Sequence, residues 1–474
     1  MLDALRATLA GIVGAPWVSS DPVVLDTAGR DALKRGHRPD LVVTPGTTAE
    51  VAAIARACHD ARVPMTVRGA GTGYTGGAVP IRGGLVIAMS RFNRILEVDA
   101  ANLLAVVQPN VITRALHTAV EAQGLFYPPD PASLAECAIG GNVAECAGGP
   151  RAFKYGTTRR YVLALEAVLP TGEILRTGSR TVKNVTGYAL TDLLVGSEGT
   201  LAIITEITLR LVPKPAARHT FAATYPTIDA AARAVGAIVA AGVIPATLEL
   251  IDAASLDAVA AHLGRSMAPP GTAALLLAEV DGGEAAALEE ARLAREACAA
   301  TGATSLVEAD TDEARAAVWE ARRELSYALR RLAPRKINHD VVVPRGRVPE
   351  LYGLIDGIRA RHGLVIAAFG HAGDGNIHVN LMVDPANHDE MRRASAAERE
   401  LFAGVVALDG AISGEHGIGY AKAQYLGLQL SAAEIALMAR LKHAFDPHGV
   451  LNPGKMWETT PEDLRGLSGE RAGD

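Results

Sequence analysis

The sequence predicts an α+β protein of at least two domains, and three observations carry this prediction. First, 474 residues are more than one hydrophobic core normally organises. Second, strand and helix patterns alternate from about residue 40 to Pro213. Third, the chain after Pro213-Lys214-Pro215 becomes helical and rich in alanine, with interspersed strands of the antiparallel type. The two prolines make this tripeptide the best candidate boundary in the chain.

The composition excludes several classes of protein. A hydrophobic fraction of 49% and a charged fraction of 21% are ordinary for a soluble globular enzyme. The net charge of -6 disfavours nucleic acid as the main partner. None of the four cysteines forms a C-x-x-C pair, so neither a zinc knuckle nor an iron–sulfur run is expected. Reduced thiols of the cytosolic type are the simplest interpretation.

The apolar stretch from Leu9 to Val18 raises the question of a targeting segment. It is short, and Asp3 stands where a signal peptide would carry a basic region. We interpret it as the end of an N-terminal helix. No stretch reaches about 18 uninterrupted apolar residues, so a transmembrane anchor is not predicted. A cytoplasmic protein is expected, with peripheral attachment to a membrane as the alternative.

The elements expected before Pro213 follow from hydrophobic spacing and turn residues. Thr47 or Thr48 can cap a helix, Gly124 closes another, and Thr171-Gly172 is a turn between two strands. The sequence predicts, in order, a strand at 41–45, a helix at 49–61, strands at 63–69 and 84–90, a hairpin at 94–111, a helix at 112–124, two strands within 161–178 and one long strand within 199–213.

The elements expected after the boundary mix strands and helices. Apolar runs predict strands at 273–282 and 363–371. Near the C-terminus, Ser431 and Glu434 form a capping-box pattern that opens a helix. The tail at 458–474 is charged and poor in apolar residues, so it is predicted to be disordered.

A glycine-rich loop, RGAGTGYTGG, extends from Arg68 to Gly77 directly after a predicted strand. Glycine-rich backbone can bring amide groups close to a phosphate. A Rossmann loop would open into a long helix, with an acidic ribose contact about 20 residues later. Here a turn and the predicted strand at 84–90 follow instead. The loop is therefore a candidate phosphate site outside the Rossmann context, with an ordinary surface loop as the alternative.

Two histidines flank a tight turn in FGHAGDGNIHVN, from Phe369 to Asn380. His371 and His378 lie on either side of Gly373-Asp374-Gly375, whose glycines favour a sharp bend. Such a bend can aim two imidazoles at one point, but a pair is too few ligands to hold a metal firmly. The motif alone leaves three interpretations open: a metal site, a catalytic site, or a turn with two polar side chains.

Further segments occur in a fixed order with this loop and these histidines. They are PGTTAEV (45–51), PPDPAS (128–133), IGGNVAECAGGP (139–150), KYGTT (154–158), VKNVTGYALTDLLVGSEGTLAIIT (182–205), SGEHGIG (413–419) and LNPGKMW (451–457). The N-terminal set resembles the FAD-binding domain of the vanillyl-alcohol oxidase flavoprotein superfamily. The C-terminal half resembles its D-2-hydroxyacid dehydrogenase branch, which includes D-lactate dehydrogenase, D-2-hydroxyglutarate dehydrogenase and the flavin subunit of glycolate oxidase. The resemblance covers approximately residues 20–457.

The resemblance implies a two-part FAD-binding domain at 1–215, an α+β substrate and metal-binding domain with an antiparallel sheet at 216–420, and a C-terminal helical segment at 421–457 that returns to the FAD domain.

The resemblance also bears on how FAD is held. Relatives that bind FAD covalently use a histidine in the glycine loop. Gly69–Thr72 contains neither histidine nor cysteine, so noncovalent FAD is expected. Cys146 stands where the family commonly has asparagine, and we interpret it as a packed small side chain. The implied FAD-binding residues are Pro45, Gly46, Thr47, Thr48, Arg68, Gly69, Ala70, Gly71, Thr72, Gly73, Thr75, Gly76, Gly77, Pro129, Ser133, Gly140, Gly141, Asn142, Tyr155, Gly156, Thr157, Glu198, Gly199, Ile204 and Asn452.

The resemblance also implies a metal-assisted oxidation. His371, His378 and Glu415 would hold a divalent cation, with Zn expected and Mn, Fe or Co as alternatives. His416 is adjacent to Glu415 but not a ligand, and it would act as the general base while hydride leaves for flavin N5. Arg322 would pair with the substrate carboxylate. The implied substrate-binding residues are Arg322, Ser326, Lys336, Asn380 and His416.

The function expected from the sequence is FAD-dependent oxidation of a D-2-hydroxyacid, such as D-lactate or D-2-hydroxyglutarate, to the 2-oxoacid. Within the family the alternative is a glycolate oxidase flavin subunit that works with partner subunits. From a different class, a flavin-free metal-dependent hydrolase would use His371, His378 and Glu415. Because no iron–sulfur run is fused to the chain, electrons would pass to a separate quinone, cytochrome or electron-transfer protein. A homodimer is the expected assembly.

Overall fold

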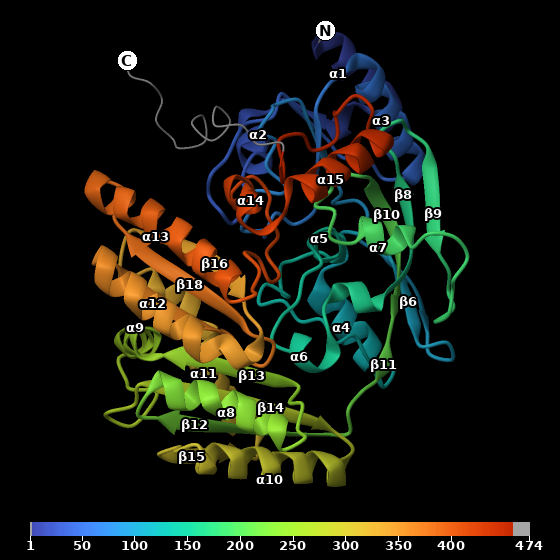
Figure 1. Ribbon diagram of the computed structural model, residues 1–474. Helices are drawn as coiled ribbons and strands as arrows, with labels where there is room; N and C mark the ends of the chain where they lie inside the picture. Colours follow the sequence, from blue (N-terminus) through green and yellow to red (C-terminus); the bar gives the residue numbers. More distant parts are fainter. Residues whose placement is uncertain (1, 458–474) are drawn as a thin grey trace. The chain divides into compact units, whose positions relative to one another are not determined.

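The structure is a computed structural model that describes residues 2–457 (Figure 1). The chain folds into two compact units. Unit 1 contains the residues up to Gly148, Thr157–Lys214 and the chain from Glu415 onward, and unit 2 contains Gly149–Gly156 and Pro215–Gly414. The predicted disordered tail at 458–474 lies outside the described residues. The division into domains proposed from the sequence remains a prediction.

A four-stranded sheet in unit 1 has the order β1-β2-β4-β3. Its strands are β1 (Val18–Ser19), β2 (Leu41–Val43), β3 (Met65–Arg68) and β4 (Leu85–Ala88). β2 and β3 both pair in parallel with β4, and α3 (Thr48–Ala61) carries the chain from the end of β2 back to the start of β3. Thr47 caps α3, since its hydroxyl accepts a hydrogen bond from the Glu50 amide at 3.2 Å.

A five-stranded antiparallel sheet in unit 1 has the order β5-β6-β10-β8-β9. Its strands are β5 (Ile95–Asp99), β6 (Leu104–Val107), β8 (Val162–Val168), β9 (Ile174–Gly178) and β10 (Ile203–Arg210). The predicted hairpin at 94–111 is β5–β6. The single long strand predicted within 199–213 is instead two strands, because β10 ends at Arg210 and β11 (Val212–Pro213) pairs with β7 (Leu125–Phe126). Pro213 has no amide with which to continue a ladder.

The first helix is shorter than the sequence suggested. We predicted that Leu9–Val18 forms the end of one helix, but α1 stops at Val13. Gly14 adopts a left-handed φ of 88°, and Pro16 follows in a short 3₁₀ turn. A left-handed glycine followed by proline cannot continue an α-helix, so the apolar run is divided between α1, the turn and β1.

The remaining helices of unit 1 connect the strands and form the C-terminal segment. They are η1 (Ala15–Trp17), α2 (Pro22–Ala28), α4 (Thr113–Glu121), α5 (Ile139–Glu145), η2 (Thr158–Tyr161), α7 (Leu190–Leu194), η4 (Ala423–Tyr425), α14 (Leu426–Gln429) and α15 (Ala432–Phe445). The predicted capping box of Ser431 and Glu434 is present at the start of α15. In the described chain, no helix combines the length and the apolar character needed to cross a membrane.

Unit 2 is built on a seven-stranded sheet with the order β15-β12-β14-β13-β17-β18-β16. Every pair in it is antiparallel, which confirms the predicted antiparallel sheet and the α+β class. Its strands are β12 (Ala217–Tyr225), β13 (Thr247–Asp252), β14 (Ala274–Gly282), β15 (Ser305–Ala309), β16 (Arg335–Val342), β17 (Val365–His371) and β18 (Asn376–Val383). Its helices are α6 (Ala152–Tyr155), α8 (Ile228–Ala240), α9 (Ala253–Leu263), α10 (Glu284–Ala300), α11 (Asp312–Leu329), η3 (Arg345–Arg347), α12 (Val348–His362) and α13 (His388–Ala407).

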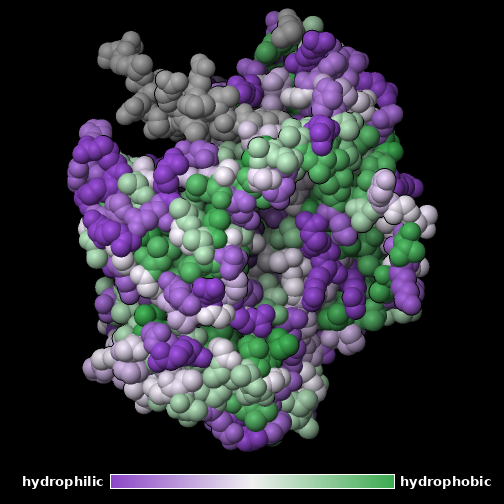
Figure 2. Space-filling view, viewed as in Figure 1, coloured by the Kyte–Doolittle hydropathy of each residue, from purple (hydrophilic) through white to green (hydrophobic). Residues whose placement is uncertain are grey.

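Helices α9 and α11 cover one face of the unit 2 sheet, where Ile251, Leu277 and Phe369 pack against residues of both helices. Helix α8 lies beside α10 and α12, and α12 lies beside α13 (Figure 1). Figure 2 shows hydrophilic residues gathered over α13. Because successive side chains of a strand alternate between faces, every second residue of β13, β17 and β18 points toward α9 and α11. Residues of the candidate site lie on this face.

The segment Gly149–Gly156 interrupts unit 1 in sequence but packs with unit 2. Two of its side chains bind Asp281 on β14, a carboxylate that is nearly buried. Lys154 Nζ lies 2.6 Å from Asp281 Oδ1, and the Tyr155 hydroxyl donates to Asp281 Oδ2 at 2.7 Å. These charge-assisted bonds explain why so short a segment belongs to the second unit.

Candidate active site

The glycine loop follows β3 and presents a row of backbone amides. Within the described chain, the N–H groups of residues 69–73 donate to no protein acceptor. Gly71 and Gly76 have left-handed φ values of 72° and 81°, which glycine adopts at no steric cost. Backbone amides normally find a partner. This row therefore offers the donors that a phosphate group requires.

Side chains at the two ends of the loop brace it against unit 1. Arg68 Nη1 donates to the carbonyl oxygens of Arg30 at 2.5 Å and Ala28 at 3.4 Å, and burial lowers the pKa of the Arg68 guanidinium. At the other end, Asn452 Nδ2 donates to the Gly77 carbonyl at 2.9 Å. Arg68 thus holds the polypeptide in place, and its contact with a pyrophosphate remains a prediction.

The other residues predicted to bind FAD lie in unit 1, with two exceptions. Tyr155 and Gly156 pack with unit 2. Those in unit 1 lie at the start of α3 (Pro45, Gly46, Thr47, Thr48), before and within α5 (Pro129, Ser133, Gly140, Gly141, Asn142), before η2 (Thr157), before and within β10 (Glu198, Gly199, Ile204) and near the C-terminus (Asn452). Asn452 Nδ2 joins two of these groups, because it also donates to the Glu198 carbonyl at 2.8 Å.

The side chain of Cys146, predicted to be a packed small one, contacts Thr157 and remains partly exposed. It is half-buried, its Sγ lies 3.3 Å from Thr157 Oγ1, and it ends α5 with a left-handed φ of 55°. Among residues other than glycine, asparagine tolerates this backbone conformation best. Cys146 thus occupies the capping position at the end of α5.

The two predicted metal histidines lie on the β17–β18 hairpin. His371 is the last residue of β17, and His378 is the third residue of β18. Both side chains are buried, and their ring centroids are 5.2 Å apart with the planes at 86°. Gly375 in the turn has a φ of 83°, and a Cβ there would collide with the Val343 carbonyl oxygen. The turn therefore requires glycine at this position.

The chain path carries Glu415 to these histidines. Asp340 lies directly opposite His378 in the β16–β18 pair, and its Oδ2 accepts a hydrogen bond from the Gly414 amide at 2.8 Å. Glu415 follows Gly414 by one peptide bond, a Cα separation of about 3.8 Å. One ligand atom from each of His371, His378 and Glu415 lies within 4.8 Å of the other two. The structure thus brings together the three residues predicted as ligands.

This group of three donors fits a divalent cation. Zn²⁺ binds imidazole nitrogen and carboxylate oxygen at about 2.0–2.2 Å, so two atoms on one ion are separated by at most about 4.4 Å. The three ligand atoms all lie within 4.8 Å of one another, which is close to that range. Two imidazoles with one carboxylate suit Zn, Mn, Fe or Co better than Ca or Mg, which prefer oxygen ligands. That this group binds a metal remains a prediction.

His416, the predicted base, is anchored to the glycine loop. Its carbonyl oxygen accepts a hydrogen bond from Thr75 Oγ1 at 3.1 Å, and its ring stacks on Tyr74 with centroids 5.3 Å apart. The Nε2 atom lies 3.9 Å from Glu415 Oε1, and 20% of the His416 side chain is exposed. An imidazole held in this way is accessible to a small ligand and adjacent to the carboxylate of the donor group.

Three of the residues predicted to bind substrate gather on and beside α11. Arg322 and Ser326 are four residues apart and share one face of the helix. Lys336 Nζ donates to Ser326 Oγ at 2.9 Å. The Arg322 guanidinium carbon lies 4.9 Å from the centre of the Phe369 ring, a cation–π contact that fixes its position. Two cations and a hydroxyl therefore lie together above the sheet face that carries the histidines.

Asn380 makes its hydrogen bonds within the sheet. It is fully buried, and Nδ2 donates to the carbonyl oxygens of Ala367 at 3.2 Å and His378 at 3.1 Å. Its Oδ1 accepts from Asn338 Nδ2 at 2.8 Å. Both amide protons are thus used inside the protein. The predicted substrate contact through Asn380 remains a prediction, with Oδ1 as the atom through which it would occur.

Comparison with known proteins identifies the family. A model described as FAD binding domain matches residues 39–178. A second model, described as FAD linked oxidases, C-terminal domain, matches residues 214–456, which is just over half of the chain. The chain belongs to the FAD-linked oxidases.

Relatives of this FAD-linked oxidase agree with the assignment. The chain is 46% identical over 419 residues to glycolate oxidase subunit GlcD of Bacillus subtilis (strain 168), covering 88% of the chain and 89% of the relative. It is 37% identical over 426 residues to D-lactate dehydrogenase of Anaerostipes hadrus, covering 88% and 90%. The structure of p-cresol methylhydroxylase with substrate bound superposes with a TM-score of 0.79 over 96% of both chains, and at 16% identity this shows the fold alone. The expected family and FAD cofactor are confirmed, and the protein is an FAD-dependent oxidoreductase of this type.

The FAD-linked oxidase has one site residue that the sequence analysis missed. Glu249 is fully buried in β13, directly opposite His371 on β17. Its Oε1 is hydrogen-bonded to His371 Nδ1, and its Oε2 accepts from Arg322 Nε. Burial would raise the pKa of the Glu249 carboxyl, but the charges and hydrogen bonds of His371 and Arg322 lower it to about 2. The signal in the sequence was a lone carboxylate inside the apolar run ATLELI.

Glu198 holds the chain that follows the predicted base. Its carboxylate accepts hydrogen bonds from the amides of Ile418 at 2.7 Å and Gly419 at 2.6 Å. Burial raises the pKa of this carboxyl, against the two amide bonds, which lower it. The side chain of Glu198 therefore fixes the loop after His416. Its predicted position near the adenosine of FAD remains a prediction.

Proposed function

We propose that this FAD-linked oxidase oxidises a D-2-hydroxyacid, R-CHOH-COO⁻, to the 2-oxoacid. One observation carries the proposal. Glu415 supplies the carboxylate of the donor group, whose other members are two histidines. The next residue in the chain, His416, offers an imidazole nitrogen 3.9 Å from the Glu415 carboxylate. An alcohol with a neighbouring carboxylate is a substrate class that can use a cation site and an adjacent base together.

The proposed reaction removes a proton from the hydroxyl and a hydride from Cα. Bound FAD, held noncovalently, supplies the two-electron acceptor, and a bound divalent cation, Zn²⁺ by preference, lowers the pKa of the substrate hydroxyl. His416 takes the hydroxyl proton. Its stacking on Tyr74 and the hydrogen bond from Thr75 to its carbonyl keep the ring in position while it does so.

Binding of the substrate carboxylate is assigned to Arg322. Its Nε donates to Glu249, so the two terminal amino groups would be the ones that pair with the substrate carboxylate. Lys336 adds a second positive charge, and Ser326, which accepts a hydrogen bond from Lys336, adds a hydroxyl. A substrate with one carboxylate next to its alcohol would use the arginine first.

A glycolate oxidase flavin subunit is the second candidate. It is favoured by the Bacillus subtilis relative, which is named as a subunit of glycolate oxidase. Glycolate is the achiral member of the same substrate class, so the same residues would serve. Partner subunits would then be needed. In both cases we expect the electrons to leave for a separate quinone, cytochrome or electron-transfer protein. A flavin-free hydrolase is disfavoured by the FAD binding domain.

Acid precipitation of the purified protein should release all of the yellow flavin into the supernatant. The reason is that the glycine loop has no histidine or cysteine between Gly69 and Thr72 to bond to the flavin. Absorbance of the supernatant and the pellet measures the outcome. Flavin that stays with the washed pellet would show that a covalent link exists elsewhere in the chain.

Anaerobic mixing with single enantiomers tests the substrate class. D-lactate, L-lactate, D-2-hydroxyglutarate, L-2-hydroxyglutarate and glycolate would each be added to the oxidised protein, and bleaching of the flavin band would be followed without any acceptor. We expect reduction by at least one D-enantiomer and none by its L-counterpart. Reduction by glycolate alone would favour the subunit candidate. Reduction by the L-enantiomers, or by none of the five, would contradict the proposal.

A further inference from the structure

Glu249 is a fully buried carboxylate whose two oxygens have different partners. It lies on β13 among residues that are all buried. Burying an ionised carboxylate is costly unless it is paired and hydrogen-bonded. Here Oε1 meets His371 Nδ1 and Oε2 meets Arg322 Nε. One side chain thus touches both a predicted metal ligand and the predicted carboxylate-binding residue.

The contact with His371 decides which ring nitrogen faces a cation. A carboxylate at Nδ1 accepts the proton of that nitrogen, so Nε2 carries the lone pair. The antiparallel register reinforces this, because Glu249 and His371 are directly paired across β13 and β17. A carboxylate partner also raises the basicity of an imidazole ligand. The orientation and the donor strength of His371 therefore depend on Glu249.

The contact with Arg322 fixes a guanidinium in the same way. Oε2 binds Nε, the nitrogen nearest the stem, and Phe369 packs against the guanidinium face at 4.9 Å. The remaining donors form a planar fork that suits a carboxylate. Without Glu249, the arginine would keep its stacking on Phe369 but lose the bond that sets its rotation.

We propose that Glu249 is a positioning residue that orients His371 for the metal and Arg322 for the substrate carboxylate at the same time. The inference rests on the proposed function, since it assumes a cation at His371 and an anion at Arg322. It predicts that one substitution, at a residue that touches neither ligand, weakens the binding of both.

The test uses Glu249→Gln in the protein with FAD bound. The glutamine amide can accept a hydrogen bond through its oxygen from only one of the two partners. We expect the affinity for Zn²⁺, measured by competition with a zinc-binding dye, to fall roughly 10–100-fold. At saturating Zn²⁺, KM for the 2-hydroxyacid that best reduces the wild-type flavin should rise about tenfold, as expected for losing one charge-assisted hydrogen bond. The fall in kcat should be smaller.

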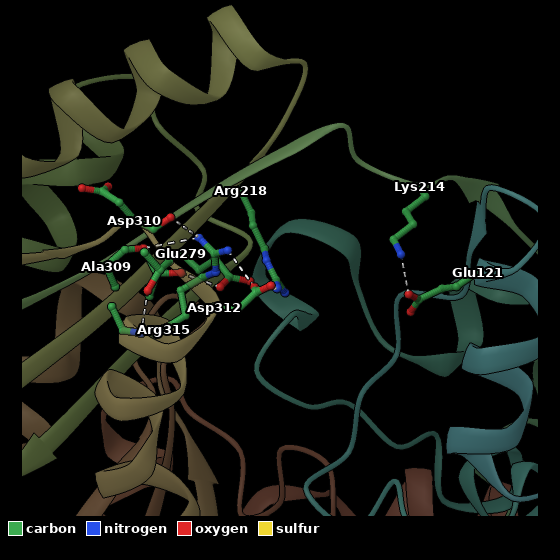
Figure 3. A network of polar contacts seen from close by, with 11 residues as sticks. Glu121, Lys214, Arg218, Glu279, Ala309, Asp310, Asp312 and Arg315 are labelled. Carbon is green, nitrogen blue, oxygen red and sulfur yellow. Dashed lines mark hydrogen bonds and ion pairs between the residues drawn. The ribbon is translucent and has the colours of Figure 1, made fainter.

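Glu279→Gln is the matched control. Glu279 is another buried glutamate on the neighbouring strand β14, and it accepts a hydrogen bond from Thr220 Oγ1 at 2.7 Å. It belongs to a different polar network, beside Arg218 and Arg315 (Figure 3). This substitution should change neither Zn²⁺ affinity nor KM, even where it lowers the melting temperature. If Glu249→Gln is too unstable to purify, Glu249→Asp, which is too short to reach both partners, should show the same two losses.

The outcomes separate this inference from the proposed function. Unchanged Zn²⁺ affinity and KM in Glu249→Gln, with wild-type protein that binds Zn²⁺, would overturn the inference alone. Equal losses in the Glu249 and Glu279 variants would also overturn it, because they would indicate general damage to the sheet. Wild-type protein that binds no divalent metal would instead overturn the metal part of the proposed function, and the inference with it.

Discussion

His416→Ala is expected to lower the rate of flavin reduction roughly 10²–10⁴-fold, the usual cost of losing a general base. FAD and Zn²⁺ should both stay bound. The loop is held through the His416 carbonyl, which accepts from Thr75, and not through the imidazole. The Glu198 carboxylate separately accepts hydrogen bonds from the backbone amides of Ile418 and Gly419. Stopped-flow absorbance gives the rate, and flavin and metal analysis give the occupancies.

Two substitutions serve as controls for His416. His443→Ala removes an exposed histidine of α15 in the same unit and should leave the rate unchanged. Glu415→Ala changes the adjacent residue and should instead lose Zn²⁺ and weaken substrate binding, because its carboxylate belongs to the donor group. If His416→Ala loses Zn²⁺, or retains a near-normal rate, the roles assigned to these two neighbours are reversed.

Features set by local sequence were predictable. The capping box at Ser431, the Thr47 cap and the turn at Thr171-Gly172 depend on residues within a few positions of each other. The antiparallel sheet of unit 2 was expected from the family resemblance, and the structure confirms it. The predicted ligands His371 and His378 also came together, since a glycine turn joins their strands.

Features set by long-range packing were not predictable from one sequence. Glu249 is 122 residues from His371 and 73 from Arg322, and only the strand register and the position of α11 bring the three together. The segment Gly149–Gly156 lies between two stretches of unit 1 in the sequence, and the bonds from Lys154 and Tyr155 to Asp281 attach it to unit 2. In both cases the decisive partner is a buried carboxylate, which local patterns do not identify.

Removal of the metal is expected to abolish turnover and leave FAD bound. The predicted ligands are His371, His378 and Glu415, whereas the amides that suit a phosphate belong to the glycine loop at 69–73. Dialysis against a chelator should therefore give a yellow, inactive protein, and added Zn²⁺ should restore the rate. Without a cation, the substrate hydroxyl keeps a pKa far above that of an imidazole, so the base has little driving force for removing its proton.

Substitution of the ligands should reproduce this loss permanently. His371→Ala and His378→Ala should each bind little Zn²⁺, keep FAD and fail to recover when Zn²⁺ is added, since three protein ligands are the minimum of a typical catalytic site. His339→Ala is the matched control: His339 is buried on β16 of the same sheet, pairs with Glu398 at 2.9 Å, and is not part of the donor group. That variant should retain Zn²⁺ and turnover. Full activity in protein shown by elemental analysis to contain no divalent metal would reduce the two histidines to a structural role in the β17–β18 hairpin.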